Sequence, residues 1–235
     1  MTIMHTFLLP STSSSRRTPG ARRMRTALAA ALAAVVLAGC GSILPTPPQR
    51  ADVYDFGPGL QQAADPQAQK PLAPIALGDF ATTGLPDGRT AVFYRLAYAN
   101  AQVLNPYTLA RWSQPPATLM QQAVRDRLSP QRAVIYGDNN IDQQIKGGKS
   151  PTILRAELEE FSQVFSSEKD SVGLVRVRAS LVDAHKAGDE LVAQHVFVAQ
   201  RPATSANAAG GARALAEAAA QVADDIAKWV EQSGH

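Results

Sequence analysis

The sequence predicts one α/β (α+β) domain with a single mixed, mostly antiparallel β-sheet of about five to six strands, flanked by helices that include an Ala-rich C-terminal helix. In the second half of the chain, three strand-like segments follow one another with only short polar links, which is typical of an antiparallel meander. In the first half, strand-like segments lie on both sides of a helical one, and that order favours a mixed sheet covered by helices. The roughly 160 residues beyond Pro74 suffice for one hydrophobic core but not for two.

The N-terminal segment has the layout of an export signal. Thr26–Gly39 is an uncharged, almost wholly apolar run preceded by five arginines. This run is shorter than the about 20 apolar residues of a membrane-spanning helix. It ends in Leu-Ala-Gly-Cys at 37–40, which is similar to the lipobox of bacterial lipoproteins, and Cys40 is the one cysteine of the chain. We expect residues 1–39 to be a signal peptide and Cys40 to carry acyl chains such as palmitate, which anchor the mature protein to a membrane.

Cleavage changes the charge of the protein. Removing five arginines from the 23 Lys and Arg leaves 18 basic against 20 acidic residues, so the mature chain is near −2. A nucleic-acid partner is excluded because no clustered basic segment survives. With its thiol acylated, the mature chain has no disulfide.

The segment after the signal is rich in Pro and Gln. We predict a Pro-rich tether over residues 40–51, with the same loose composition continuing to about residue 74. Extended at about 3.1 Å per residue, the whole stretch would reach roughly 100 Å. Within it, Asp52–Gly57 is apolar and aromatic, so we interpret it as a short strand of the domain, which we assign to residues 52–235.

The elements in the first half of the domain have recognisable boundaries. Ile75–Phe80 and Ala91–Tyr98 are predicted strands, and Leu85–Arg89 between them contains the Pro-Asp-Gly sequence of a turn. Pro115–Leu128 is predicted to be a helix because its prolines fall in the first turn and its apolar residues recur at helical spacing. Val134–Tyr136 is a short apolar strand.

The elements in the second half are longer. Thr152–Phe165, Val172–Val182 and Leu191–Gln200 are the predicted meander. In the middle strand, apolar residues at odd positions from 175 to 181 alternate with arginines at 176 and 178. Ser205–Glu231 is the predicted Ala-rich helix, whose apolar stripe should pack on the sheet.

Motifs for catalysis or cofactor binding are weak throughout. Gly147–Ser150 reads Gly-Gly-Lys-Ser, but the first glycine of a phosphate-binding loop is missing and Pro151 blocks the helix that should follow, so we interpret it as a polar loop. The mature chain retains His185, His195 and His235 without zinc-site spacing. No Gly-x-Ser-x-Gly sequence is present. We expect no enzyme activity, no metal and no cofactor other than the lipid on Cys40.

Two groups of polar residues have a simpler structural interpretation. Glu157, Glu159 and Glu160 suggest acid–base carboxylates, but arginines at 155, 176 and 178 make cross-strand ion pairs on a solvated face the simpler account. Arg111 and Trp112 stand just before the predicted helix. A tryptophan there is more often part of the core, yet an Arg–Trp pair is also typical of interface anchors, so both are candidates for partner contact.

Several stretches together resemble the ABC-type transport auxiliary lipoproteins, the PqiC-like family. After the lipobox, the similar stretches are YDFGP at 54–58, YRLAYAN at 94–100, RWSQPP at 111–116, EEFSQVF at 159–165, VRVRA at 175–179 and the C-terminal helix. The resemblance implies an auxiliary lipoprotein of an MCE-type ABC system that moves lipids or other hydrophobic molecules. It also implies an MCE-domain protein as partner and, through it, a permease and an ATPase.

The resemblance implies a place in the cell envelope. Gly41 follows the lipidated cysteine where some bacteria use aspartate for inner-membrane retention, so the periplasmic face of the outer membrane is expected, with the inner membrane as the alternative. A second hypothesis is a structural or assembly lipoprotein of the outer membrane that binds envelope protein or polymer without a transporter.

Overall fold

The computed structural model describes residues 49–59, 72–86, 89–136, 150–185 and 188–234. The predicted signal peptide, Cys40, most of the predicted tether, residues 147–149 of the predicted polar loop, and His235 lie outside these residues. The strands are β1 (Asp52–Tyr54), β2 (Ile75–Thr82), β3 (Ala91–Leu96), β4 (Ala101–Trp112), β5 (Val134–Tyr136), β6 (Thr152–Phe165), β7 (Ser171–His185) and β8 (Gly188–Pro202). The helices are α2 (Ala97–Asn100), α3 (Pro116–Leu128) and α4 (Ala208–Gln232).

Within the described ranges, strand β6 is the centre of one mixed sheet of eight strands. One edge of β6 pairs with β7 in antiparallel register from Ile153 to Phe165, and β7 in turn pairs antiparallel with β8. The other edge of β6 is shared by two parallel partners, because β2 pairs with its first half and β3 with its last residues. Strands β4 and β1 extend the sheet beyond β3, and β5 extends it beyond β2. The predicted mixed sheet is thus confirmed.

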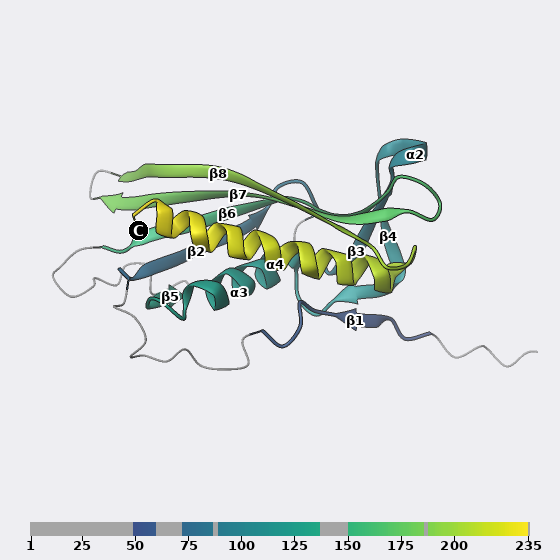
Figure 1. Cartoon of the computed structure of the whole chain (residues 1–235), viewed down its shortest axis with the longest axis horizontal. Helices are drawn as coiled ribbons and strands as arrows, with labels where there is room; N and C mark the ends of the chain where they lie inside the picture. Colours follow the sequence, from purple (N-terminus) through teal and green to yellow (C-terminus); the bar gives the residue numbers. More distant parts are fainter. Residues whose placement is uncertain (1–48, 60–71, 87–88, 137–149, 186–187, 235) are drawn as a thin grey trace, which may run out of the picture. The chain divides into compact units, whose positions relative to one another are not determined.

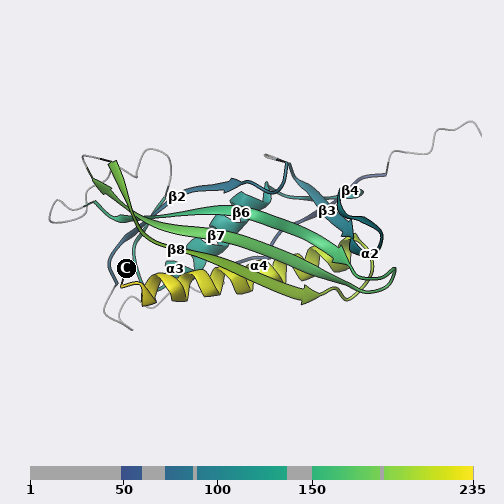
Figure 2. The same ribbon diagram turned by 90° about the horizontal axis from the view of Figure 1, so that it is seen from above.

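Both long helices lie on the same face of this sheet (Figures 1 and 2). Helix α3 begins with prolines whose missing N–H groups have no intrahelical acceptor in any case. Helix α4 begins where the Asn207 side chain accepts a hydrogen bond from the Gly210 amide. Its buried stripe packs on β6, β7 and β8, and includes Leu215, Val222 and Ile226. In the part of the chain that is described, no helix is long and apolar enough to cross a membrane.

Most predicted elements are confirmed, and the alternation in β7 explains why. Val175, Val177, Ala179 and Leu181 are at most 1% exposed beneath the helices, whereas Arg176 is exposed on the opposite face. An alternating pattern with one buried face fixes both the strand and its register.

The sheet has more strands than the expected five to six, and one of them, β4, was not predicted from the sequence at all. Residues 101–112 lack regular alternation, contain Pro106 and are mostly exposed, so they carry no apolar pattern for a strand. The preceding strand also ends earlier than predicted, at Leu96, since the chain turns through the single-turn helix α2 before returning as β4. Strands β3 and β4 therefore form a hairpin near one edge of the sheet, where β1 is the outermost strand.

Candidate functional site

A cluster of aromatic rings fixes the N-terminal segment of the domain in the core. Phe56 lies edge-on to Trp112 with ring centroids 5.5 Å apart, and it stacks on Phe161 at 5.7 Å. Tyr54 contacts the same Trp112 ring from β1. Because β1 also pairs with β4, the segment from Asp52 to Phe56 is part of the folded domain.

The structure separates the two residues predicted as partner contacts. Trp112 is 1% exposed and fills the core, the alternative that the sequence also allowed, so its ring does not reach the surface. Arg111 alternates with it along β4 and is exposed. Contact with a partner therefore stays a prediction for Arg111 only.

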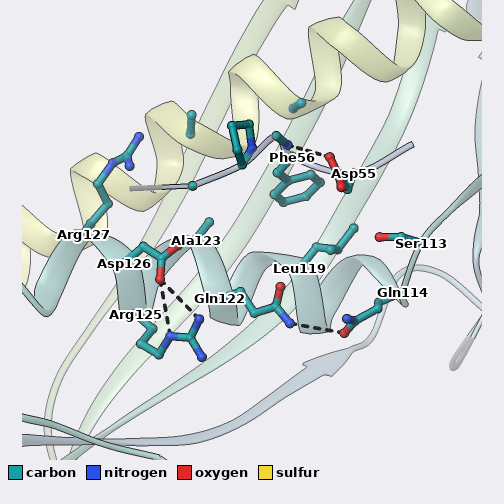
Figure 3. Close-up of a pocket in the computed structure, with 15 residues that line it drawn as sticks. Asp55, Phe56, Ser113, Gln114, Leu119, Gln122, Ala123, Arg125, Asp126 and Arg127 are labelled. Carbon is teal, nitrogen blue, oxygen red and sulfur yellow. Dashed lines mark hydrogen bonds and ion pairs between the residues drawn. The ribbon is translucent and has the colours of Figure 1, made fainter. Parts of the chain in front are cut away.

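A cleft of about 550 Å³ opens between this N-terminal segment and the helices α3 and α4 (Figure 3). The chain turns over it at Gly57 and Gly59, whose φ angles of +92° and +64° favour glycine. The Gly57 amide donates to Asp55 Oδ1 at 2.8 Å, which fixes the turn. A Cβ on Gly59 would stand 2.7 Å from Asp126 Oδ2, so the turn is packed closely on α3.

The walls of the cleft have two kinds of surface. Leu119, Ala216 and Ala220 supply apolar wall, with Phe56 beside them. Several of the polar side chains are bonded in pairs: Gln122 Nε2 donates to Gln114 Oε1 at 3.2 Å, Arg125 bonds Asp126 at 3.3 Å, and Arg127 bonds Asp224 of α4. An open cleft with both apolar and polar walls is suited to binding a peptide segment or a small molecule.

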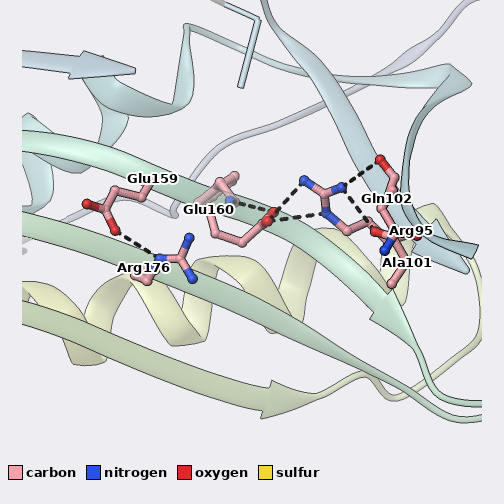
Figure 4. A network of polar contacts seen from close by, with 7 residues as sticks. Arg95, Ala101, Gln102, Glu159, Glu160 and Arg176 are labelled. Atoms are coloured by element: carbon pink, nitrogen blue, oxygen red, sulfur yellow. Dashed lines mark hydrogen bonds and ion pairs between the residues drawn. The ribbon is translucent and has the colours of Figure 1, made fainter. Parts of the chain in front are cut away.

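The opposite face of the sheet carries the predicted ion pairs (Figure 4). Glu159 accepts from Arg176 at 2.9 Å and from Arg178 at 2.8 Å, which confirms cross-strand pairing as the role of this glutamate. A bulge between Leu158 and Glu160 moves Glu160 to a different partner, Arg95 of β3, at 3.0 Å. Arg155 bonds Asp189 at 2.8 Å rather than a glutamate of its own strand.

A buried polar chain joins β4, β6 and β7 near the start of α4. Tyr107 donates to Gln163 Oε1 at 2.8 Å, and Gln163 Nε2 donates to Ser171 Oγ at 2.7 Å. Burial, with a smaller contribution from Tyr94, raises the pKa of Tyr107 to about 12. Gly211 leaves room for this network, since a Cβ there would stand 2.0 Å from Gln163 Oε1. No local pattern in the sequence indicates this network, because its members are far apart in the chain.

The described histidines have ordinary structural surroundings. His185 Nε2 lies 3.2 Å from Glu190 Oε2 across the β7–β8 link, and His195 packs on Phe197 and Trp229. Among the described residues, no group of three or more His, Cys, Asp or Glu side chains is placed to hold a metal ion.

Comparisons with known proteins agree with the fold. Residues 61–227 match the family model described as ABC-type transport auxiliary lipoprotein component. Protein XCC0632 from Xanthomonas campestris has a similar structure with a TM-score of 0.59 and 18% identity, covering 78% of this chain and 96% of that one. An uncharacterized protein is similar with a TM-score of 0.52 and 13% identity, covering 77% of this chain and 99% of that one. No curated protein matched the chain.

Proposed function

The chain belongs to the family of ABC-type transport auxiliary lipoprotein components, and from this membership we propose that it links an MCE-type ABC system for lipids or other hydrophobic molecules to the outer membrane. The family match over residues 61–227 carries the proposal, because it spans nearly all of the folded domain. Acyl chains on Cys40 would hold the protein on the periplasmic face of that membrane. Its direct partner would be the MCE-domain protein, which connects it to the permease and the ATPase.

The cleft of Figure 3 is the proposed binding site for that partner. It is open, combines apolar and charged walls, and is built from three separate segments that the fold brings together. Arg111 is a second contact candidate because it is exposed on β4, next to the strand that leads into the cleft. A binding role fits both surfaces.

Affinity purification of the intact, lipidated chain from solubilised envelope tests the proposal. We expect the MCE-domain protein, the permease and the ATPase to be recovered with it. Ala220→Phe should fill the cleft and reduce their recovery at least tenfold. Glu217→Phe is the matched control, because Glu217 lies on the same helix, is exposed and does not line the cleft.

The outcomes separate the two candidate functions. Recovery of envelope structural protein or polymer without any transporter component would contradict the transport role and favour an assembly lipoprotein. Equal recovery with Ala220→Phe and Glu217→Phe would instead place the binding site outside the cleft.

A further inference from the structure

The hairpin formed by β3 and β4 ends in an exposed, uncharged surface, which we call the hairpin tip and define as residues 97–103. All seven of these residues are exposed, and their side chains are Ala, Tyr, Ala, Asn, Ala, Gln and Val. Tyr98 is 49% exposed and Val103 is 45% exposed. A soluble surface normally intersperses charges, so a tip without any is unusual for a segment that meets only water.

The hairpin tip is held in a defined conformation. The Arg95 guanidinium donates to the carbonyl oxygens of Ala101 and Gln102 at 3.3 and 3.4 Å, and Glu160 holds that guanidinium from the sheet (Figure 4). Asn100 Oδ1 accepts from the Gln102 amide at 3.0 Å. Tyr98 and Val103 are therefore presented on a fixed turn.

The hairpin tip lies at the end of the domain where the chain enters it. Strand β1 runs parallel to β4, with Asp52 opposite Ala110, so residues 49–51 run back toward the beginning of β4. Figure 1 shows α2 and the first described residues at the same end of the domain, with the end of α4 at the other.

The chain between the anchor and the domain is short. Because β1 and Phe56 are part of the fold, the predicted tether is limited to residues 40–51, and the reach of roughly 100 Å expected for the longer stretch does not apply. Nine peptide steps separate Cys40 from Gln49, which at about 3.5 Å each limit their distance to roughly 30 Å. A lipidated Cys40 would therefore keep this end of the domain near the bilayer.

We propose that the hairpin tip rests in the headgroup region of the membrane that carries the acyl anchor, with Tyr98 and Val103 as its lipid contacts. The inference rests on the proposed lipidation of Cys40. Tyrosine is well suited to this depth, because its ring is apolar and its hydroxyl stays hydrated. Strand β7 has 15 residues and is therefore about 50 Å long. In this orientation the far end of the sheet lies about that distance from the bilayer, where it can meet a partner in the periplasm.

Site-directed fluorescence on the full lipidated protein tests this orientation. Cys40 is the one cysteine and its sulfur is consumed by acylation, so a cysteine introduced elsewhere can be labelled uniquely. Tyr98→Cys and Val103→Cys, each carrying an environment-sensitive dye, are reconstituted into vesicles of phosphatidylethanolamine and phosphatidylglycerol. Leu191→Cys is the matched control, since Leu191 is apolar, 59% exposed and located beside the β7–β8 link at the far end.

The fluorescence emission of the dyes at positions 98 and 103 should shift to shorter wavelength. Lipid-bound nitroxides should quench these two dyes at least twofold more than the dye at position 191. Equal, water-like spectra at all three positions, from protein that floats with the vesicles, would overturn the orientation and leave the proposed function intact. Failure of the full-length protein to float would overturn both the lipid anchor and the inference built on it.

Discussion

Phe56 packs edge-on against Trp112, with ring centroids 5.5 Å apart and ring planes at 90°. The contact joins a residue near the tether to the last residue of β4, which leads into α3. It makes the N-terminal segment one wall of the cleft and fixes this segment in the folded domain.

Phe56→Ala should destabilise the domain and release this segment. Removing the ring leaves a cavity against Trp112 and Phe161, which we expect to lower the free energy of unfolding by about 3 kcal/mol. Urea denaturation measures the stability, and limited proteolysis near residues 49–59 detects the release. Val53→Ala is the control because Val53 lies in the same N-terminal segment and is 62% exposed, and it should change stability by less than about 0.5 kcal/mol.

Arg132→Met should stabilise the domain. Arg132 is 5% exposed, and its guanidinium nitrogens have no hydrogen-bond partner within the described ranges. Burial lowers the pKa of Arg132, although the Glu231 carboxylate opposes this shift. Replacing the guanidinium with an apolar side chain of similar length should raise the free energy of unfolding by about 1–3 kcal/mol. Arg127→Met is the control: it removes a bonded partner of Asp224 and should not raise the free energy of unfolding. If Arg132→Met destabilised the domain, the buried charge of Arg132 would have to be compensated.

Alkaline pH should weaken the fold through Tyr107. Its pKa rises from 10 to about 12 on folding because burial disfavours the phenolate. The contribution of Tyr107 to the free energy of unfolding is therefore constant below pH 10 and is lost as the pH rises toward 12. Tyr107→Phe should lower stability near neutral pH, since Gln163 loses a hydrogen bond, but it should flatten the decline above pH 10. Urea denaturation across this range tests it. Tyr98→Phe, at an exposed tyrosine, is the control, and its stability should vary with pH as that of the wild-type protein does. If stability declined above pH 10 as steeply in Tyr107→Phe as in the wild-type protein, Tyr107 would not be the cause of the decline.

Glu160→Ala and Glu159→Ala should differ although the residues are adjacent. Glu160 is 8% exposed and holds Arg95, so its loss leaves a half-buried guanidinium unpaired and should lower stability by about 2–3 kcal/mol. Glu159 pairs with Arg176 and Arg178, both of which are more exposed than Arg95. Its loss should therefore lower the free energy of unfolding by about 1 kcal/mol or less. Hydrogen exchange should also speed up over residues 97–103 in Glu160→Ala alone. Equal exchange in both variants would mean that Arg95 does not hold the hairpin tip.

The parts of the fold that sequence reasoning predicts are those with a buried face. Strands β6 and β7 and helix α4 bury regular apolar positions, and these positions are visible as period-2 or helical patterns. Strand β4 lies near the sheet edge with few buried residues, so its pairing with β3 and β1 comes from tertiary context.

The candidate site was less predictable for the same reason. The cleft exists because Gly57 and Gly59 return the chain over α3, and nothing local in the sequence places Gly59 near Asp126. The Arg95–Glu160 pair spans 65 residues and depends on a bulge that no periodicity shows. The pairing of Glu159 with Arg176 and Arg178 was predictable, because these residues lie on neighbouring strands of one meander.

The central claim is that this lipoprotein works as part of an ABC transport system. Epistasis in the source cells tests this claim most directly. Three strains are compared: one lacks this gene, one lacks the ATPase gene of the recovered system, and one lacks both. The measured quantity is the distribution of labelled phospholipid between the inner and outer membranes. The account predicts the same defect in all three strains, restored in the first by the full chain and not by Cys40→Ala. A double deletion clearly worse than either single deletion, or a wild-type distribution without this gene, would contradict it.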